Sequence, residues 1–314
     1  MSIAEIPQLF GVGKAQELTR LEQGHINETY IALCGGRKYV LQSLNEEVFR
    51  DPDAVMENIR RICAAFEQEG GDFRVPHFLT ADGRNFVRCG GSVWRMYDFA
   101  EKCGGSDFLV GASFGTFIRT VQGIELADTI EDLHDLGAYL ARLETLAPDC
   151  PELVRLKKLW RDIGGVFDDL PKRNVHGDAK ADNVVTGETC TIIDLDTAMR
   201  GYAAIDYGDA VRSVMGANCD KSRIEEVKRG FLSGAGESLS QAETESLPYG
   251  VLYTVGELAA RYLIDCYSEN RYFRDKTLEQ CRKRADELMA QLDKLGSNAL
   301  LTDCKKDREK YGKT

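Results

Sequence analysis

One stretch, NVHGDAKADNVVTGETCTIIDLDTAMR at residues 174–200, limits what this chain can fold into more than any other. Its apolar runs and turn residues predict a strand, a loop, a second strand, a turn at 186–188 and a third strand. Four polar residues stand at the ends of these strands: His176, Asp178, Asn183 and Asp194. Phosphoryl transfer needs few protein groups, because the enzyme mainly positions the reactants and neutralises charge. The stretch is therefore typical of a phosphotransferase site.

Each of these polar residues fits a different role in phosphoryl transfer. One carboxylate has to accept the proton of an attacking hydroxyl group, and Asp178 fits that role. Asn183 and Asp194 fit a magnesium pair, because this ion prefers hard oxygen ligands. Lys180 could steady the transferred phosphate as a point charge. The structural alternative makes Asp178 and Asn183 turn formers and Asp194 the end of a strand. However, the pattern His-x-Asp-x-x-x-x-Asn is expected by chance in only about one chain in a hundred. This rarity favours the catalytic interpretation.

The length of the chain and its charge narrow the class of protein. A chain of 314 residues exceeds what one compact core usually holds, so two packed lobes are expected. Lys plus Arg number 40 against 51 Asp plus Glu, and the net charge of −11 argues against nucleic-acid and anionic membrane partners. Because no apolar run could span a membrane and the N-terminus lacks a secretory pattern, a cytoplasmic location is expected. The ten cysteines include no C-x-x-C pair, which favours reduced thiols.

The pattern of predicted elements changes near residue 100. Before it, extended runs at 29–34 and 38–44 flank a Gly-Gly turn, a helix begins at Asp51-Pro52 and closes at Gly70, and extended runs follow at 84–88 and 92–99. Beyond it, helical periodicity dominates at 112–124, 131–147, 151–169, 220–235, 239–268 and 274–295. Only a short hairpin at 173–196 interrupts these helices. The lobe boundary is therefore expected at 100–106.

The residues HGDAKADN at 176–183, followed by IIDLDT at 192–197, resemble the catalytic loop and metal strand of the aminoglycoside phosphotransferase and choline kinase superfamily. The resemblance implies an α+β, two-lobed protein-kinase-like fold with a small antiparallel-sheet N-lobe and a larger, mainly helical C-lobe. The expected parts are a nucleotide-binding lobe at 1–100, a connection at 101–106, a catalytic and substrate lobe at 107–300 and a frayed tail at 301–314. The protein-kinase motifs G-x-G-x-x-G, D-F-G and A-P-E are missing, so protein substrates are not expected.

Seven further stretches are similar to the N-acetylhexosamine 1-kinase branch of that superfamily. They are GHINETY at 24–30, YVLQSLN at 39–45, DPDAVMENI at 51–59, WRMYDF at 94–99, IDLDTAMRG at 193–201, IDYGDAVR at 205–212 and ARYLIDCY at 260–267. Each is weak alone, but their order and spacing from near the start to about residue 268 are specific. The resemblance implies ATP as phosphate donor with Mg²⁺, Asp178 as the base, and Asn183 and Asp194 on the metal.

The resemblance assigns two segments to ATP. The loop at 24–30 would cover the phosphates, and the backbone at the end of the 94–99 strand would meet the adenine, although a hairpin turn and an apolar core strand explain the same stretches. Kinase-like proteins hold the phosphates with a Lys on the third strand, paired to a helix Glu. Here Gln42 stands in that place, Lys38 lies early in the strand and Glu57 faces away. We expect Gln42 to bind a phosphate without charge. The residues expected at ATP are Asn27, Thr29, Gln42, Tyr97, Asp98 and Phe99.

Two other groups of residues take roles from the resemblance. His134 and Asp135 are similar to a sugar-contacting segment, with an exposed helix start as the alternative, and Arg212 is a further candidate for the substrate. Asp206 would brace the catalytic loop together with His176, although an acidic residue that stabilises a helix N-terminus explains Asp206 as well.

The sequence thus predicts an ATP- and magnesium-dependent kinase of a small molecule. The resemblance points to the anomeric hydroxyl of an N-acetylhexosamine as acceptor. Two alternatives stay open: a kinase of another small alcohol such as choline, homoserine or an aminoglycoside, and a pseudokinase that binds ATP without transfer. The intact set of Asp178, Asn183 and Asp194 favours an active enzyme over the pseudokinase.

Overall fold

The structure is a computed structural model that describes residues 1–21, 26–101, 104–187 and 189–297. Parts of four sequence predictions lie outside the described residues: Gly24 and His25 of the phosphate loop, residues 102–103 of the connection, Glu188 of the turn, and the tail at 301–314. The chain forms two compact units. Unit 1 comprises residues 1–105, 120–131 and 183–200, and unit 2 comprises residues 106–119, 132–182 and 201–314.

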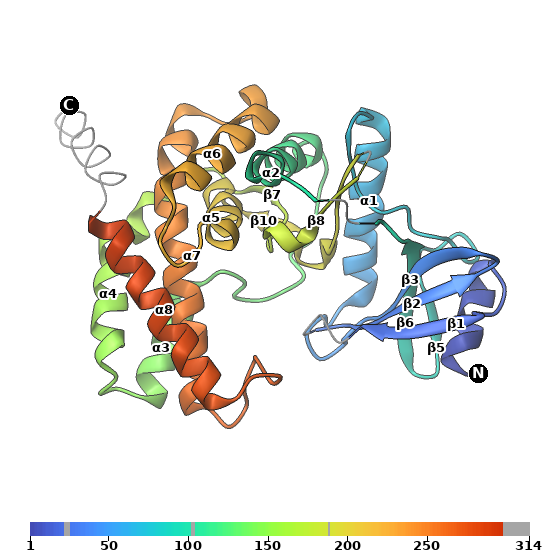
Figure 1. Ribbon diagram of the computed structural model, residues 1–314, viewed down its shortest axis with the longest axis horizontal. Helices are drawn as coiled ribbons and strands as arrows, with labels where there is room; N and C mark the ends of the chain where they lie inside the picture. Colours follow the sequence, from blue (N-terminus) through green and yellow to red (C-terminus); the bar gives the residue numbers. More distant parts are fainter. Residues whose placement is uncertain (22–25, 102–103, 188, 298–314) are drawn as a thin grey trace. The chain divides into compact units, whose positions relative to one another are not determined.

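Unit 1 contains a five-stranded antiparallel sheet in the order β1-β2-β3-β6-β5 (Figure 1). The strands are β1 (Glu17–Leu21), β2 (Glu28–Cys34), β3 (Arg37–Ser43), β5 (Val87–Cys89) and β6 (Ser92–Asp98). The predicted hairpin is confirmed, because Gly35 (φ 57°) and Gly36 (φ 80°) join β2 to β3 in the left-handed conformation that two-residue hairpin turns require. The 3-10 helix η1 (Ile3–Phe10) adds Ile6 and Phe10 to the core of this sheet.

The helix α1 (Pro52–Glu69) explains why unit 1 includes two segments from later in the chain. Asp51 caps it by accepting from the Ala54 N–H at 3.0 Å, as the sequence predicts. Its buried Asn58 donates to the carbonyls of Ala127 at 2.9 Å and Ala198 at 3.1 Å. These bonds attach residues 120–131 and 183–200 to α1, although both ranges lie within the predicted second lobe.

A second, three-stranded sheet in unit 1 carries the sequence predicted to bind the metal. It has the order β4-β9-β8, formed by β4 (Phe73–Arg74), β9 (Cys190–Ile192) and β8 (Val184–Thr186). β8 and β9 are antiparallel, and β4 joins β9 in parallel. The 3-10 turns η3 (Ala181–Asn183) and η4 (Leu195–Thr197) lie at the ends of this β8–β9 hairpin. The sequence predicted the hairpin but not its partner β4.

Unit 2 is mainly helical (Figure 1). Its elements are α2 (Asp107–Val121), α3 (Leu136–Leu146), α4 (Pro151–Ile163), η2 (Gly164–Val166), β7 (Arg173–Val175), α5 (Ala203–Val214), α6 (Lys221–Ala235), η5 (Gly236–Ser238), α7 (Gln241–Tyr267) and α8 (Leu278–Ser297). The short strand β10 (Met199–Gly201) begins in unit 1 and ends at Gly201, the first residue of the following unit 2 segment. α7 is buried along most of its length, where α3, α4, α5 and α8 pack against it. None of the described helices combines the length and apolarity needed to cross a membrane.

The backbones of α5 and α7 touch each other. A methyl group built at Gly250 would lie 1.7 Å from the Ala204 carbonyl oxygen, and one built at Gly208 would lie 2.2 Å from that of Gly250. Only glycine permits this approach, because any side chain would force the helices apart. The contact matters for function because α5 carries Asp206, Asp209 and Arg212.

One predicted helix begins later than expected. The periodicity predicts a helix over 131–147, but α3 begins at Leu136. Asp132 (φ 55°) and His134 (φ 59°) have left-handed backbones, which an α-helix excludes, and Asp135 caps α3 by accepting from the Ala138 N–H at 2.9 Å. The prediction was wrong for residues 131–135, because the apolar spacing continues there without helical backbone.

Candidate active site

The catalytic-loop sequence of unit 2 follows strand β7 and begins with a buried histidine. His176 is fully buried, and its ring lies edge-on to the rings of Phe114 and Phe117 at centroid distances of 5.2 and 5.3 Å. Its Nδ1 accepts from the Asp178 N–H at 3.3 Å. The ring is thus held by packing while it bonds to the backbone of Asp178, which agrees with a supporting role.

Asp206, in the first turn of α5, binds the backbone of this loop. Its carboxylate accepts from the N–H groups of His176 at 2.7 Å and Gly177 at 2.9 Å. Burial raises the pKa of Asp206 to about 7, while the two N–H groups and the charge of His134 oppose that rise. Both bonds fix the chain just before Asp178, so Asp206 determines where the loop starts.

His134 binds the same loop from another side. Its Nε2 lies 2.8 Å from the Gly177 carbonyl oxygen, and its Nδ1 lies 2.8 Å from Oε2 of Glu257 on α7. Burial by itself lowers the pKa of His134, but the Glu257 carboxylate raises it to about 10. The side chain that the sequence assigns to the substrate is therefore engaged on both ring nitrogens.

Asp178 and Lys180 form an ion pair within the loop. Lys180 Nζ lies 2.5 Å from Asp178 Oδ2, and 29% of the Asp178 side chain and 36% of the Lys180 side chain are exposed. The Ala181 N–H donates to Ser213 Oγ at 2.9 Å, which ties the end of the loop to α5. A carboxylate with this exposure can meet a small molecule, and the Lys180 ammonium places a positive charge beside it.

The other two residues predicted for the substrate have structural partners. One carboxylate oxygen of Asp135 accepts the hydrogen bond that caps α3. Arg212 donates from Nε and Nη2 to Asp209 Oδ1 at 2.9 and 2.8 Å, and both side chains are largely buried. Their roles at the substrate stay predictions.

In unit 1, the two residues predicted for the metal lie at the same end of the β8–β9 hairpin. Asn183 ends η3 and Asp194 precedes η4, and the Ile193 N–H donates to the Asn183 carbonyl oxygen at 2.9 Å. Asp194 has a left-handed backbone with φ 62° and ψ 58°. A non-glycine residue adopts that conformation at a cost of about 1–2 kcal/mol, and such strain often marks functional sites.

The donor chemistry of this pair fits magnesium. Among the described residues, no three His, Cys, Asp or Glu side chains are placed to hold a metal together. Magnesium at a nucleotide does not need such a cage, because phosphates and water complete its six oxygen ligands beside one or two protein groups. Asn183 and Asp194, an amide and a carboxylate, would hold the ion in that way.

A buried ion pair that the sequence analysis missed lies next to this turn. Arg95 on β6 donates to both oxygens of Asp196 in η4, and the two side chains are each only 2% exposed. Arg95 Nε and Nη2 also donate to Gln42 Oε1 at 3.0 and 2.8 Å. The sequence did carry one signal, since Arg95 interrupts an apolar strand, and the structure places it opposite Gln42 in the register of β3 and β6.

Three of the residues predicted for ATP join this ion pair in one chain of hydrogen bonds. Gln42 Nε2 donates to Thr29 Oγ1 at 2.9 Å, and Asn27 Nδ2 donates to Asp196 Oδ2 at 2.6 Å. Asn27 Oδ1 also accepts from the Asn45 N–H at 3.0 Å. The side chains of Asn27 and Gln42 are thus bound to protein groups, and their phosphate contacts stay predictions.

The segment predicted for adenine has its own partners. The Tyr97 ring stacks obliquely on Phe78 at 4.9 Å. The Asp98 N–H donates to the His77 carbonyl at 3.1 Å and the Phe99 N–H to the Lys38 carbonyl at 3.4 Å. A base would therefore have to use other backbone groups of this segment.

The residues considered for a kinase-type ion pair bind elsewhere. Lys38 lies 3.6 Å from Glu101, and Glu57 binds Arg60 and Arg61 at 2.7 and 2.8 Å. Arg60 and Arg61 hold the pKa of Glu57 down at about 2. Among the described residues of this sheet, the buried cation is Arg95, on the strand next to the one where a Lys is sought.

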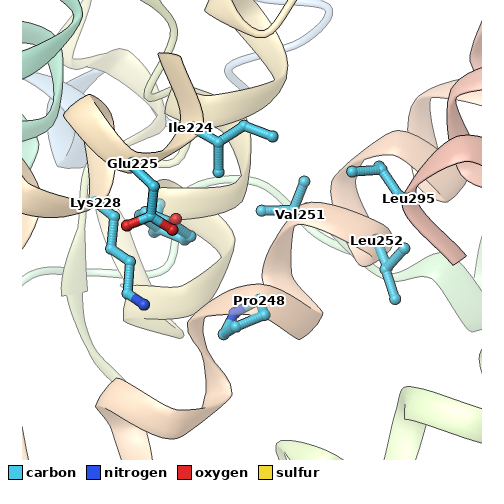
Figure 2. Close-up of a pocket in the computed structure, with 8 residues that line it drawn as sticks. Ile224, Glu225, Lys228, Pro248, Val251, Leu252 and Leu295 are labelled. Carbon is cyan, nitrogen blue, oxygen red and sulfur yellow. The ribbon is translucent and has the colours of Figure 1, made fainter. Parts of the chain in front are cut away.

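A pocket in unit 2 is separate from these residues (Figure 2). It lies among α5, α6, α7 and α8, with Glu225 and Lys228 from α6 beside the apolar side chains of Val251 and Leu252. Pro248 on α7 and Leu295 on α8 complete its apolar wall. The residues that line it include none of those predicted for catalysis, nucleotide or acceptor.

Fold and loop sequence together define a phosphotransferase. Residues 17–242 match the model of the phosphotransferase enzyme family, APH, and the chain belongs to that family.

Solved structures agree with this assignment at the level of fold. A choline/ethanolamine kinase family protein from Mesorhizobium loti shares 19% identity at a TM-score of 0.66, covering 96% of this chain and 95% of that one. An aminoglycoside phosphotransferase from Alicyclobacillus acidocaldarius shares 16% identity at 0.63, covering 94% and 93%. Amicoumacin kinase in complex with AMP-PNP, Ca²⁺ and Ami shares 15% identity at 0.65, covering 89% of each chain. The predicted α+β kinase-like fold is confirmed.

Proposed function

We propose that this protein is an ATP- and magnesium-dependent kinase that transfers the γ-phosphate to a hydroxyl group of a small molecule. One observation carries the proposal: the loop around Asp178 is bound through its backbone by Asp206 and His134 on both sides of Gly177. A loop that only formed a turn would not need a buried carboxylate and a largely buried imidazole to fix it, because burying ionisable groups is costly.

In the proposed reaction, Asp178 accepts the proton of the acceptor hydroxyl as its oxygen attacks the γ-phosphorus. As the Asp178 carboxylate takes up the proton, its attraction for Lys180, 2.5 Å away, would weaken, and the ammonium would attract the transferred phosphate. Magnesium, held by Asn183 and Asp194, would neutralise charge on the triphosphate. Arg95 would support the turn that carries Asp194 by holding Asp196 in a buried ion pair.

For the acceptor we propose the anomeric hydroxyl of an N-acetylhexosamine. The support is the sequence resemblance of the stretches at 24–30, 193–201 and 205–212. A sugar offers no charge, so the site has to recognise it by hydrogen bonds and to reject analogues that leave its polar groups unpaired. The fold similarity to a choline/ethanolamine kinase family protein makes amino alcohols the natural competitors in a test.

The test is a screen of ADP release with Mg-ATP and one acceptor at a time. The panel contains N-acetylglucosamine, N-acetylgalactosamine, galactose, choline, homoserine and an aminoglycoside, with Asp178→Asn and omission of magnesium as controls. We expect an N-acetylhexosamine to give the highest kcat/KM and its 1-O-methyl glycoside to be inert, because the accepting hydroxyl is blocked.

Each other outcome has a distinct meaning. Equal rates with the methyl glycosides would show transfer to another hydroxyl. A higher kcat/KM for choline or homoserine would refute the sugar acceptor and keep the kinase. Mg-ATP binding without ADP release from any acceptor would favour the pseudokinase.

A further inference from the structure

His134 has a backbone conformation that the surrounding structure enforces. Its φ of 59° lies in the left-handed region, which is unfavourable for a non-glycine residue. The Tyr253 hydroxyl donates to the His134 carbonyl at 2.6 Å and accepts from the Leu136 N–H at 3.0 Å. Strain of this kind persists only where neighbouring groups fix it, and here it directs the imidazole at the catalytic loop.

The imidazole and Asp206 fix the two peptide groups that flank Gly177. Asp206 Oδ1 accepts from the Gly177 N–H at 2.9 Å, and His134 Nε2 lies 2.8 Å from the Gly177 carbonyl oxygen. Gly177 itself has a φ of 78°. The second of these peptide groups leads directly into Asp178, so its orientation sets the direction of the proton-accepting carboxylate.

The partners of His134 require the charged form of the ring. The Gly177 carbonyl and the Glu257 carboxylate can only accept hydrogen bonds, and a neutral imidazole has a single N–H. Only the imidazolium can donate to both at 2.8 Å. A neutral ring would place a lone pair against one of the two oxygens.

From this geometry we infer that His134 is a positioning residue, whose imidazolium orients Asp178 through the Gly177 carbonyl instead of binding the acceptor. The inference rests on the proposed kinase function. The charged groups around the ring are Glu257 and Arg261 on α7 and Asp206, Asp209 and Arg212 on α5. Glu257 is the direct partner, and Arg261 Nη1 lies 3.6 Å from its other oxygen.

The experiment uses the full chain and the best N-acetylhexosamine of the screen. Asn tolerates the left-handed backbone, so His134→Asn removes the imidazolium with little added strain. We expect kcat to fall about 10–100-fold, the scale of a misplaced catalytic group, while the acceptor KM stays within about two-fold. A raised acceptor KM with unchanged kcat would overturn the inference and support the substrate role. Unchanged kcat and KM with lower thermal stability would overturn it in favour of a purely structural role.

A second variant tests the charge without removing the ring. Glu257→Gln keeps an acceptor for Nδ1 but removes the carboxylate, so the alkaline limb of kcat should move about 1–3 pH units toward neutral. Glu152→Gln is the matched control, because Glu152 is also buried and paired with an arginine, Arg282, on elements away from the loop. The control should keep the wild-type limb. An unmoved limb in Glu257→Gln would refute the inference.

Imidazole NMR separates this inference from the proposed function. The chain has four histidines, so the His134 signal can be assigned by its loss in His134→Asn. We expect His134 to be doubly protonated at pH 8 in the wild type and in Glu152→Gln, and to lose its second proton about 1–3 pH units lower in Glu257→Gln than in the wild type. A wild-type ring that is neutral at pH 8 would overturn the inference even if the kinase is active. Failure of every acceptor, with the ring charged as expected, would overturn the kinase assignment alone.

Discussion

Replacing Arg95 with methionine should destabilise the protein through the carboxylate that it leaves behind. Arg95 and Asp196 are each only 2% exposed, so neither charge is compensated by water. Arg95→Met keeps an unbranched apolar chain but leaves the Asp196 carboxylate buried, with the neutral Asn27 amide still donating to it. Breaking a buried pair from one side costs about 3–5 kcal/mol, and we expect a loss of unfolding free energy in that range.

Urea unfolding followed by circular dichroism measures this loss against a matched control. Arg88 lies on β5 in the same sheet and pairs with Asp53, but about half of each side chain is exposed (51% and 55%). Arg88→Met should therefore cost no more than about 1 kcal/mol. The double variant Arg95→Met/Asp196→Leu removes both charges and should recover most of the loss.

Two results would refute this reasoning. Equal losses for Arg95→Met and Arg88→Met would show that water reaches the Arg95–Asp196 pair. A double variant as unstable as Arg95→Met would show that packing, and not the stranded charge, sets the cost. If the double variant is stable, its Mg-ATP affinity then reports what the pair contributes to the nucleotide site.

The remaining predictions concern the candidate site directly. Asp178→Asn should keep the fold and ATP binding while lowering turnover at least ~100-fold, and an unaltered rate would remove Asp178 from the mechanism. Asp194→Ala should abolish the magnesium-dependent part of nucleotide binding in calorimetry with and without the ion, whereas tight Mg-ATP binding would refute the metal assignment. Gln42→Ala should raise the KM for ATP more than it lowers kcat, and normal ATP dependence would show that Gln42 makes no nucleotide contact.

Local signals carried the correct predictions of the fold. The Gly35-Gly36 turn and the Asp51 cap are properties of a few neighbouring residues, and both occur as predicted. β1 and β4 were missed because their residues carry no local signal of this kind. Glu17–Leu21 is short and mostly polar, and Phe73–Arg74 has only two residues, so neither shows the alternation that identifies a strand.

The site shows where sequence reasoning reaches its limit. The loop residues were identifiable because Asp178 and Asn183 lie close together in one motif. Arg95 and Asp196 are 101 positions apart, and His134 and Glu257 are 123 positions apart. No periodicity links residues at that separation, so the side chains that support the site became visible only when the chain was folded. Tertiary packing determines which distant residues become partners, and a local sequence pattern carries no information about that packing.

Because Glu257 pairs with His134, the free energy of unfolding should depend on pH between the unfolded and folded pKa values of His134. Its folded pKa of about 10 lies above its ordinary value of 6.5. A raised histidine pKa stabilises the folded state fully below pH 6.5, and this contribution is lost as the pH rises through 10. The stability difference between wild type and His134→Asn should therefore shrink as the pH rises from 8 to above 10. Asp206 titrates near pH 7 and stays outside this range. Urea unfolding midpoints of wild type and His134→Asn, measured from pH 8 to above 10, give this stability difference. A difference that stays constant would contradict a charged His134 in the folded protein.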